Sequence, residues 1–246
     1  MLVPTKTLSA PPFIVQTTIG KVTNGGRGQF ALVQFDPIHY QDALFEYFGL
    51  HFPPALYSAV DKRRAEFLAG RYAAQLLLQK EGCYEAVPIQ EDRSPQWPKK
   101  WRGSISHTKG HAIAIVVPSS SSYWPGVDIE HLPSFNVQEI ANSILTSKEQ
   151  RMLSECGLEN NLALLLAFSV KESLYKALFP LVRRFFGFEA AEIYQVDLYQ
   201  QKVSLRLTQM LSPLLPAGTQ LTGYYQIYTD YFITCLLYTS PSPRDS

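Results

Sequence analysis

The sequence predicts an α+β protein, because segments typical of strands and segments typical of helices occur together in each half of the chain. Short apolar runs bounded by turn-forming residues are typical of strands, and they occur on both sides of the serine-rich stretch Ser119–Ser122. Longer segments over 61–80 and 162–179 are predicted helices. Each half therefore combines helices with a small sheet, which is the α+β arrangement.

The N-terminal half is predicted to contain one long helix and several strands. The apolar segment Phe30–Phe35 has the composition of a buried strand. Asp61 is expected to cap a helix that runs to about Lys80, in which apolar residues recur at helical spacing along one face. Two further strands are expected near Gly103–Ser106 and His111–Val117.

The C-terminal half is predicted to begin with a short strand, Gly126–Glu130. Thr146 is followed three residues later by Glu149, which is the pattern of a helix capping box. A long helix is expected over Leu162–Phe179, and Pro180 is expected to end it. The remaining predicted strands are Ile193–Tyr199, Lys202–Leu207, Gln220–Tyr228 and Tyr231–Leu236.

The low-complexity stretch after Pro118 divides the chain into predicted domains over 1–118 and 119–237. The last nine residues, 238–246, contain two prolines and three serines and have no apolar pattern. We therefore expect an unstructured tail there, of the kind that a non-native extension would form.

The composition excludes several classes of protein. The formal net charge of the 246 residues is +1, which gives no general attraction to nucleic acid or to an anionic membrane. The three cysteines lack C-x-x-C spacing, which argues against a disulfide framework or a zinc site. The N-terminus has no apolar core of signal-peptide length, and the longest strongly apolar run, Leu162–Phe168, is too short to span a bilayer. We expect a cytoplasmic protein that binds neither nucleic acid nor membrane.

Carboxylates in two segments predict a metal site. Asp128 and Glu130 are two residues apart on a predicted strand, so their side chains point to the same face. Glu172 and Lys176 are four residues apart on a predicted helix and share a face there. Three carboxylates brought together would suit Mg²⁺ and a phosphate-bearing ligand. The alternative is a solvated carboxylate pair on the strand and an ordinary Glu–Lys pair on the helix.

Basic residues gather on the N-terminal predicted helix. Lys62, Arg63 and Arg64 open this helix, and Arg71 follows further along it. Positive charges in a first turn are unfavourable for the helix dipole, so such a cluster is consistent with an anion site. A solvated helix face is the alternative.

Ser106 and His107 form a pair at the end of a predicted strand. A hydroxyl, an imidazole and nearby backbone N–H groups can together bind a phosphate. A structural histidine is the alternative. An adjacent Ser–His pair is poor geometry for a nucleophile and its base, so nucleophilic hydrolysis is not expected.

Five segments in this order resemble the 4'-phosphopantetheinyl transferase superfamily, in particular its enterobactin-synthase-component-D-like branch of siderophore biosynthesis. They are Lys62–Arg71, Pro95–Pro98, Gly103–His107, Gly126–Glu130 and Phe168–Lys176. The resemblance implies two similar halves in a pseudo-twofold arrangement, with the active site in a cleft between them. It also implies that the protein is a monomer. The implied reaction moves the phosphopantetheine arm of coenzyme A onto a serine of an acyl, aryl or peptidyl carrier protein and releases adenosine 3',5'-bisphosphate.

The resemblance also implies residue roles. Asp128, Glu130 and Glu172 match the family's ligands to Mg²⁺. Glu172, or a water that it holds, matches the proposed base for the carrier serine, and Lys176 would offset charge at the bridging oxygen. The positions that match contacts to coenzyme A are Lys62, Arg63, Arg64, Arg71, Arg93, Ser106 and His107.

Two other functions are compatible with the same residues. A metal-dependent phosphoesterase or pyrophosphatase would use the three carboxylates with water and need no carrier protein. A catalytically inactive carrier-binding module would need none of them, so their presence argues against it.

Overall fold

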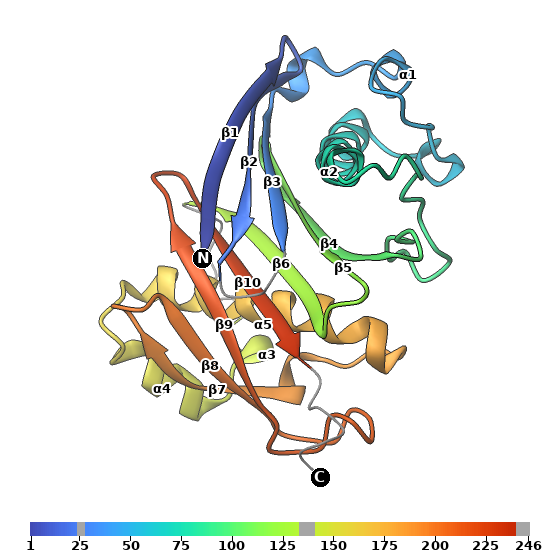
Figure 1. Ribbon diagram of the computed structural model, residues 1–246. Coiled ribbons are helices and arrows are strands. Elements are labelled where there is room, and N and C mark those ends of the chain that lie inside the picture. Colours follow the sequence, from blue (N-terminus) through green and yellow to red (C-terminus); the bar gives the residue numbers. More distant parts are fainter. Residues whose placement is uncertain (24–27, 133–140, 240–246) are drawn as a thin grey trace. The chain divides into compact units, whose positions relative to one another are not determined.

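The computed structural model in Figure 1 describes residues 1–23, 28–132 and 141–239. The chain divides into two compact units, Met1–Ser121 and Ser122–Ser246. Each unit contains a five-stranded antiparallel sheet with helices packed on it, so the predicted α+β class is confirmed. The predicted domain boundary after Pro118 stays a prediction. The predicted cleft between two pseudo-symmetric halves also stays a prediction.

The first unit is built on a sheet with the strand order β1-β2-β3-β5-β4. Its elements are β1 (Leu2–Ala10), β2 (Ile14–Val22), β3 (Gln29–Phe35), η1 (Pro37–His39), α1 (Ala43–Tyr47), η2 (Pro54–Leu56), α2 (Asp61–Lys80), β4 (Trp101–Thr108) and β5 (His111–Pro118). The long helix α2 packs across β3, β5 and β4 (Figure 1). The buried alanines and leucines of α2 and the apolar residues of these strands form the core of the unit.

The predicted extent of α2 is confirmed, but its predicted cap is wrong. Val60 occupies the cap position in an extended conformation, and Asp61 is the first helical residue. There its carboxylate still interacts favourably with the helix dipole. A methyl group at Gly70 would lie 2.9 Å from Cγ2 of Ile105, so this glycine lets the helix approach β4 closely.

The strands β1 and β2 were not predicted. Most residues of β1 are exposed, so its sequence shows little of the alternation that identifies a half-buried strand. Pro4 within β1 is tolerated because this strand forms the edge of the sheet.

The second unit is built on a sheet with the strand order β6-β10-β9-β8-β7. Its elements are β6 (Tyr123–His131), α3 (Ala141–Ile144), α4 (Ser147–Ser154), α5 (Asn160–Val182), η4 (Phe188–Ala190), β7 (Ala191–Asp197), β8 (Lys202–Leu207), β9 (Gln220–Ile227) and β10 (Tyr231–Thr239). Helix α5 packs on β6, β10 and β9, and α4 packs on α5 and β7.

The predicted capping box of α4 is confirmed. The Oγ1 atom of Thr146 accepts a hydrogen bond from the Glu149 amide at 3.2 Å. In return, the Thr146 amide donates to the Glu149 carboxylate at 2.8 Å. These bonds satisfy two donors that a helix start would otherwise leave open.

The prediction that Pro180 ends the long helix is wrong. Helix α5 continues to Val182 and ends where Arg183 adopts a left-handed conformation with φ of 55°. The Arg183 amide still donates to the Phe179 carbonyl at 2.8 Å, because a proline removes only its own donor. No helix within the described ranges is long and apolar enough to cross a membrane.

The prediction of an unstructured segment from residue 238 onward is also corrected. Tyr238 and Thr239 are the last residues of β10, which lies between β6 and β9 in the sheet. Tyr238 pairs with Trp124 and is only 6% exposed. The rest of that predicted tail, 240–246, lies outside the described residues.

Candidate active site

The predicted carboxylate cluster forms where β6 meets α5. A side chain at Gly126 would overlap the backbone carbonyl of Ser173, so glycine allows the strand to lie directly against the helix. Asp128 is two residues further along β6 and therefore faces the same helix. Val127, between Gly126 and Asp128, is buried on the opposite face of β6.

Both oxygens of Asp128 are held by residues of α5. The Nζ atom of Lys176 lies 2.6 Å from Oδ1 of Asp128, and the hydroxyl of Ser169 donates to Oδ2 at 2.7 Å. Asp128 is only 4% exposed and Ser169 is fully buried, so their hydrogen bond is shielded from solvent, whereas the Lys176 side chain of the ion pair is 25% exposed. The shielding strengthens the hydrogen bond relative to the same pair in water, and the ion pair to a smaller extent.

Glu130 and Glu172 interact electrostatically with this pair. Burial and the negative charges of Asp128 and Glu172 together raise the pKa of Glu130 to about 8, and Lys176 opposes the rise. Burial also raises the pKa of Glu172, where Lys176 opposes and Asp128 adds to the shift. The sequence-predicted residues Asp128, Glu130, Glu172 and Lys176 therefore form one electrostatic cluster.

The donor set of this cluster is chemically suited to a hard divalent cation, because it consists of three carboxylates. Within the ranges that the structure describes, however, no three Asp, Glu, His or Cys side chains are arranged to hold a metal ion. In this arrangement, Lys176 provides the positive charge at Asp128. The metal role of Asp128, Glu130 and Glu172 stays a prediction.

Sequence reasoning missed a buried hydroxyl group network behind Asp128. It consists of Ser169 and Ser173 on α5 and Thr234 on β10, all of them fully buried. The two serines lie four residues apart, with Glu172 between them in the sequence. This spacing, which places both on one face of the helix, was the only sign of the network in the sequence. Thr234 is paired with Asp128 across the β6–β10 ladder, which only the sheet topology reveals.

Lys171, the neighbour of Glu172, forms a buried ion pair that supports the structure. It is 3% exposed, and its Nζ atom lies 2.7 Å from the Glu149 carboxylate. It also donates to the carbonyls of Ile144 and Phe188 at 2.9 and 3.1 Å. Burial lowers the pKa of Lys171, and the hydrogen bond to Glu149 opposes this. The pair joins α5 to α4 and to the segments around them.

An apolar pocket of about 230 Å³ lies beside Glu172. Its lining residues are Lys171, Glu172, Leu174, Tyr175, Phe185, Phe186, Gly187, Phe188 and Ala191. The ring of Tyr175 packs against Phe186 with 4.9 Å between centroids, which gives the pocket an aromatic wall. Glu172 thus contributes both to the carboxylate cluster and to an apolar cavity.

In the first unit, His107 lies between two residues of α2. Its Nε2 atom lies 2.5 Å from the Arg63 guanidinium, and its Nδ1 atom lies 3.4 Å from the Glu66 carboxylate. Arginine can only donate, so Nε2 accepts and the proton of the neutral ring lies on Nδ1. Burial raises the pKa of Glu66, while Lys62 and Arg63 oppose this.

Arg71 is a buried cation further along α2. It is 8% exposed and lies over the Phe67 ring, 4.6 Å from the centroid. Burial, together with the nearby charge of Arg63, lowers the pKa of Arg71 to about 10. Among the described residues, none accepts a hydrogen bond from its Nε atom. A buried guanidinium nitrogen without an acceptor is costly, which is consistent with an anion-binding residue.

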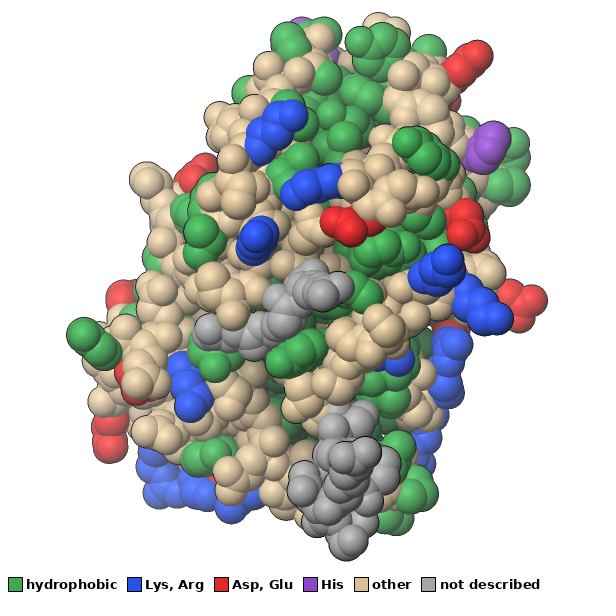
Figure 2. All heavy atoms as spheres, in the orientation of Figure 1, with side chains coloured by type: hydrophobic (Ala, Val, Ile, Leu, Met, Phe, Trp, Pro, Cys, Tyr) green, Lys and Arg blue, Asp and Glu red, His purple; other side chains and the backbone are tan. Residues whose placement is uncertain are grey.

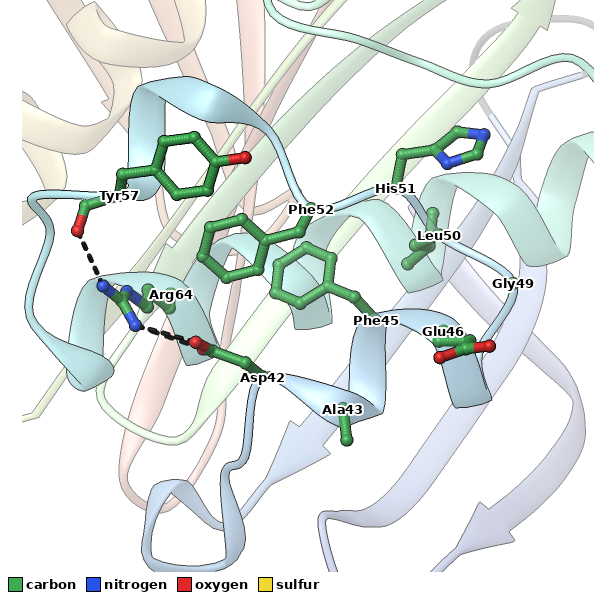
Figure 3. Close-up of a pocket in the computed structure, with 10 residues that line it drawn as sticks. All are labelled: Asp42, Ala43, Phe45, Glu46, Gly49, Leu50, His51, Phe52, Tyr57 and Arg64. Carbon is green, nitrogen blue, oxygen red and sulfur yellow. Dashed lines mark hydrogen bonds and ion pairs between the residues drawn. The ribbon is translucent and has the colours of Figure 1, made fainter.

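Arg64 differs from its neighbours because its donors are used within the protein. They bond to the carbonyls of Leu56 and Tyr57 at 3.1 and 2.9 Å and to the carboxylate of Asp42 at 3.0 Å. Figure 3 shows the contacts to Tyr57 and Asp42 at the side of a pocket of about 660 Å³. The role of Arg64 as a coenzyme A contact stays a prediction.

The other predicted contacts to the nucleotide are less closely grouped. Lys62 is exposed in the first turn of α2. Arg93 is exposed in a turn, with φ of 66°. Ser106 is buried on the face of β4 opposite to His107, because successive side chains of a strand alternate. On the face of the molecule in Figure 2, Lys and Arg side chains lie in several separate groups.

Comparisons with known proteins agree with the resemblance. Residues 52–117 match the 4'-phosphopantetheinyl transferase N-terminal domain, and residues 125–226 match the 4'-phosphopantetheinyl transferase superfamily. The chain is 37% identical over 204 residues to enterobactin synthase component D of Salmonella typhi, covering 82% of this chain and 80% of that protein. It is 44% identical over 151 residues to the Escherichia coli K12 protein of the same name, covering 59% and 68%.

A more distant relative is the 4'-phosphopantetheinyl transferase PptT of Mycobacterium tuberculosis. It is 32% identical over 144 residues, covering 57% of this chain and 62% of that protein. The superfamily match includes Asp128, Glu130, Glu172 and Lys176, the residues of the electrostatic cluster. This chain belongs to the 4'-phosphopantetheinyl transferase superfamily.

Proposed function

We propose that this enzyme transfers the 4'-phosphopantetheine arm of coenzyme A to a serine of an apo carrier protein, with Mg²⁺, and releases adenosine 3',5'-bisphosphate. The names of its relatives place the reaction in the synthesis of a siderophore or another nonribosomal peptide. The observation that carries the proposal is the packing of β6 on α5, which brings three carboxylates and a lysine into one electrostatic cluster.

Asp128, Glu130 and Glu172 would hold the Mg²⁺ ion, which would neutralise charge on the pyrophosphate of coenzyme A. Lys176 adds positive charge at the same place, as its contact with Asp128 indicates. In this proposal its ammonium group stabilises charge that develops on the leaving phosphate.

Glu172 is the proposed base for the carrier serine. It adjoins the carboxylate cluster on one side and an apolar pocket on the other. The pocket would take the uncharged part of the phosphopantetheine arm and exclude water from the attacking hydroxyl. Exclusion of water favours transfer to the carrier over hydrolysis.

The first unit supplies the proposed contacts to the phosphate on the ribose. Arg63 of α2 and His107 of β4 are in contact, and the buried Arg71 lies further along α2. Arginine and histidine donors bind a phosphate through charge-assisted hydrogen bonds. We assign the 3'-phosphate to these residues.

We further infer that the enzyme acts as a cytoplasmic monomer. Coenzyme A and carrier proteins are intracellular reactants, and the cysteines Cys83, Cys156 and Cys235 are free thiols.

The test is to incubate the protein with coenzyme A, Mg²⁺ and a panel of apo acyl, aryl and peptidyl carrier proteins, and to measure the mass of each carrier. A transferase adds one phosphopantetheine to the carrier serine. A metal-dependent phosphoesterase would consume coenzyme A without changing any carrier mass, and that result would contradict the proposal. Carrier binding without any reaction would indicate an inactive binding module.

A further inference from the structure

We propose that Ser173, Thr234 and Ser169 form a chain of buried hydroxyl groups that positions Asp128 in the proposed metal site. The inference rests on the proposed function and names three positioning residues for it. These residues act through Asp128 and do not themselves touch the reactants.

The chain consists of short contacts that lead to one carboxylate oxygen. Oγ of Ser173 lies 2.7 Å from Oγ1 of Thr234, which lies 2.8 Å from Oγ of Ser169. The Ser169 hydroxyl then donates to Oδ2 of Asp128 at 2.7 Å. These distances are typical of good O–H···O hydrogen bonds.

The bond from Ser169 to Asp128 is the one with a fixed direction. Each hydroxyl has one proton, and the carboxylate of Asp128 accepts that of Ser169. The Ser169 oxygen can then accept from Thr234, and the Thr234 oxygen from Ser173. The Thr234 hydroxyl also lies 2.9 Å from the Ser169 carbonyl, and the Ser173 hydroxyl lies 3.1 Å from the Thr234 carbonyl, so these two protons are shared with the backbone. Ser169 therefore contributes most to the orientation of Asp128, and the other two hydroxyls support it more weakly.

The chain determines how Asp128 is oriented. The Ser169 hydroxyl donates to Oδ2 of Asp128, and Oδ1 of Asp128 faces Lys176 at 2.6 Å. Ser169, Ser173 and Thr234 are fully buried, so water cannot replace a missing hydroxyl. A metal ligand needs a fixed orientation, and hydrogen-bonded groups behind a ligating carboxylate provide it.

A purely structural polar cluster would behave differently. Loss of any hydroxyl would then lower the thermal stability but leave Mg²⁺ binding by the folded protein unchanged. Under our proposal, removal of a hydroxyl lowers the Mg²⁺ affinity more strongly the closer that hydroxyl lies to Asp128 along the chain. Ser169→Ala has the largest effect, Thr234→Val a smaller one and Ser173→Ala the smallest.

The experiment measures the Kd of Mg²⁺ by calorimetry in full-length protein saturated with coenzyme A, without carrier protein. Ser169→Ala should weaken Mg²⁺ about ten-fold or more, because a hydrogen bond to a charged group is lost. Thr234→Ser keeps the hydroxyl and should retain the wild-type Kd, whereas Thr234→Val should not. Ser204→Ala, which removes a buried hydroxyl of β8, is the control and should leave the Kd unchanged.

The melting temperature and the carrier KM are measured in parallel, and neither should follow the Mg²⁺ series. If Thr234→Val fails to fold, the comparison of Ser169→Ala with Ser173→Ala still tests the order. Equal Mg²⁺ affinity in wild type, Ser169→Ala and Ser173→Ala overturns the inference, and so does a wild type that binds no Mg²⁺.

The turnover of the wild-type protein with the panel of carrier proteins tests the proposed function separately. A graded Mg²⁺ series in a protein that modifies no carrier would support the hydroxyl chain while rejecting the transferase. If the wild type modifies carriers normally but all variants bind Mg²⁺ with the same affinity, the transferase is supported and the hydroxyl chain is rejected.

Discussion

At the scale of single residues, the site brings together buried charged groups that destabilise the free protein. Asp128, Glu130 and Glu172 repel one another, and burial makes each charge more costly. Lys176 offsets part of this repulsion. In the first unit, the buried guanidinium of Arg71 is a similar cost. Groups that are costly in the free protein are consistent with ligands of the opposite charge.

We predict that Asp128→Ala removes most of the turnover while the protein remains folded. The substitution removes a proposed metal ligand and leaves Lys176 without its anionic partner. The rate of carrier modification and the circular dichroism spectrum test this. Glu155→Ala, an exposed carboxylate elsewhere in the second unit, should keep wild-type activity. Full activity in Asp128→Ala would reject the metal site.

His107→Ala is predicted to weaken coenzyme A but to leave dephospho-coenzyme A almost unaffected, because the latter lacks the 3'-phosphate. A charge-assisted hydrogen bond contributes about 1.5–3 kcal/mol, or about ten- to a hundred-fold in affinity. Calorimetric Kd values for both ligands, in wild type and variant, isolate the contact. The exposed His51→Ala is the control. Equal losses for the two ligands would indicate that His107 only supports Arg63 and Glu66.

At the scale of elements, two close approaches build the site. Gly70 lets α2 approach β4, and Gly126 lets α5 approach β6. The same helix α5 carries Lys176 toward Asp128 and Lys171 toward Glu149. The position of the helix therefore depends on both a glycine contact and a buried ion pair.

Gly126→Ala should lower both stability and activity, because the new methyl group would overlap the Ser173 carbonyl and push β6 away from α5. Overpacking of this kind costs about 1–3 kcal/mol. Urea unfolding and carrier modification measure the two effects. Gly28→Ala, where a methyl group would meet its nearest neighbour at 3.3 Å, should be milder. An unchanged stability in Gly126→Ala would mean that the two elements can separate without cost.

Lys171→Met should destabilise the second unit by about 3–5 kcal/mol, because it leaves the buried Glu149 carboxylate without its cation. Urea unfolding measures the loss. Lys148→Met, which breaks an exposed pair with Glu192, should cost no more than about 1 kcal/mol. The double variant Lys171→Met/Glu149→Gln should recover part of the loss. If it recovers none, the carbonyl contacts of Lys171 are more important than the ion pair.

At the scale of the whole molecule, each unit contributes one half of the proposed chemistry. The first unit contains the proposed phosphate contacts around His107 and Arg71. The second contains the carboxylate cluster and the apolar pocket. The match to the family spans both, over residues 52–117 and 125–226.

We predict that EDTA stops the reaction and that added Mg²⁺ restores it, because three carboxylates form a hard-oxygen site that exchanges its ion. In the active enzyme, one adenosine 3',5'-bisphosphate should appear for each carrier modified. Chromatography of the nucleotide together with carrier mass spectrometry tests both statements. Undiminished transfer in EDTA would exclude a dissociable metal, and excess nucleotide release would indicate hydrolysis.

The sequence by itself determined the local features, because each depends only on neighbouring residues. Helical spacing predicted α2 over Asp61–Lys80, and the Thr146–Glu149 pattern predicted the capping box of α4. A spacing of two predicted that Asp128 and Glu130 share a face of a strand. The order of five short motifs was enough to indicate the family.

Only the tertiary structure decided the features that join distant segments. Thr234 lies behind Asp128 because β10 pairs with β6, and no local pattern shows this. Arg64 is engaged by a loop, whereas Arg71, on the same helix, is buried with an open donor. Helix α5 runs past Pro180, because its packing on β6, β10 and β9 offsets the one donor that the proline removes. These outcomes depend on which segments pack together, and packing energy outweighs local preference wherever side chains are buried.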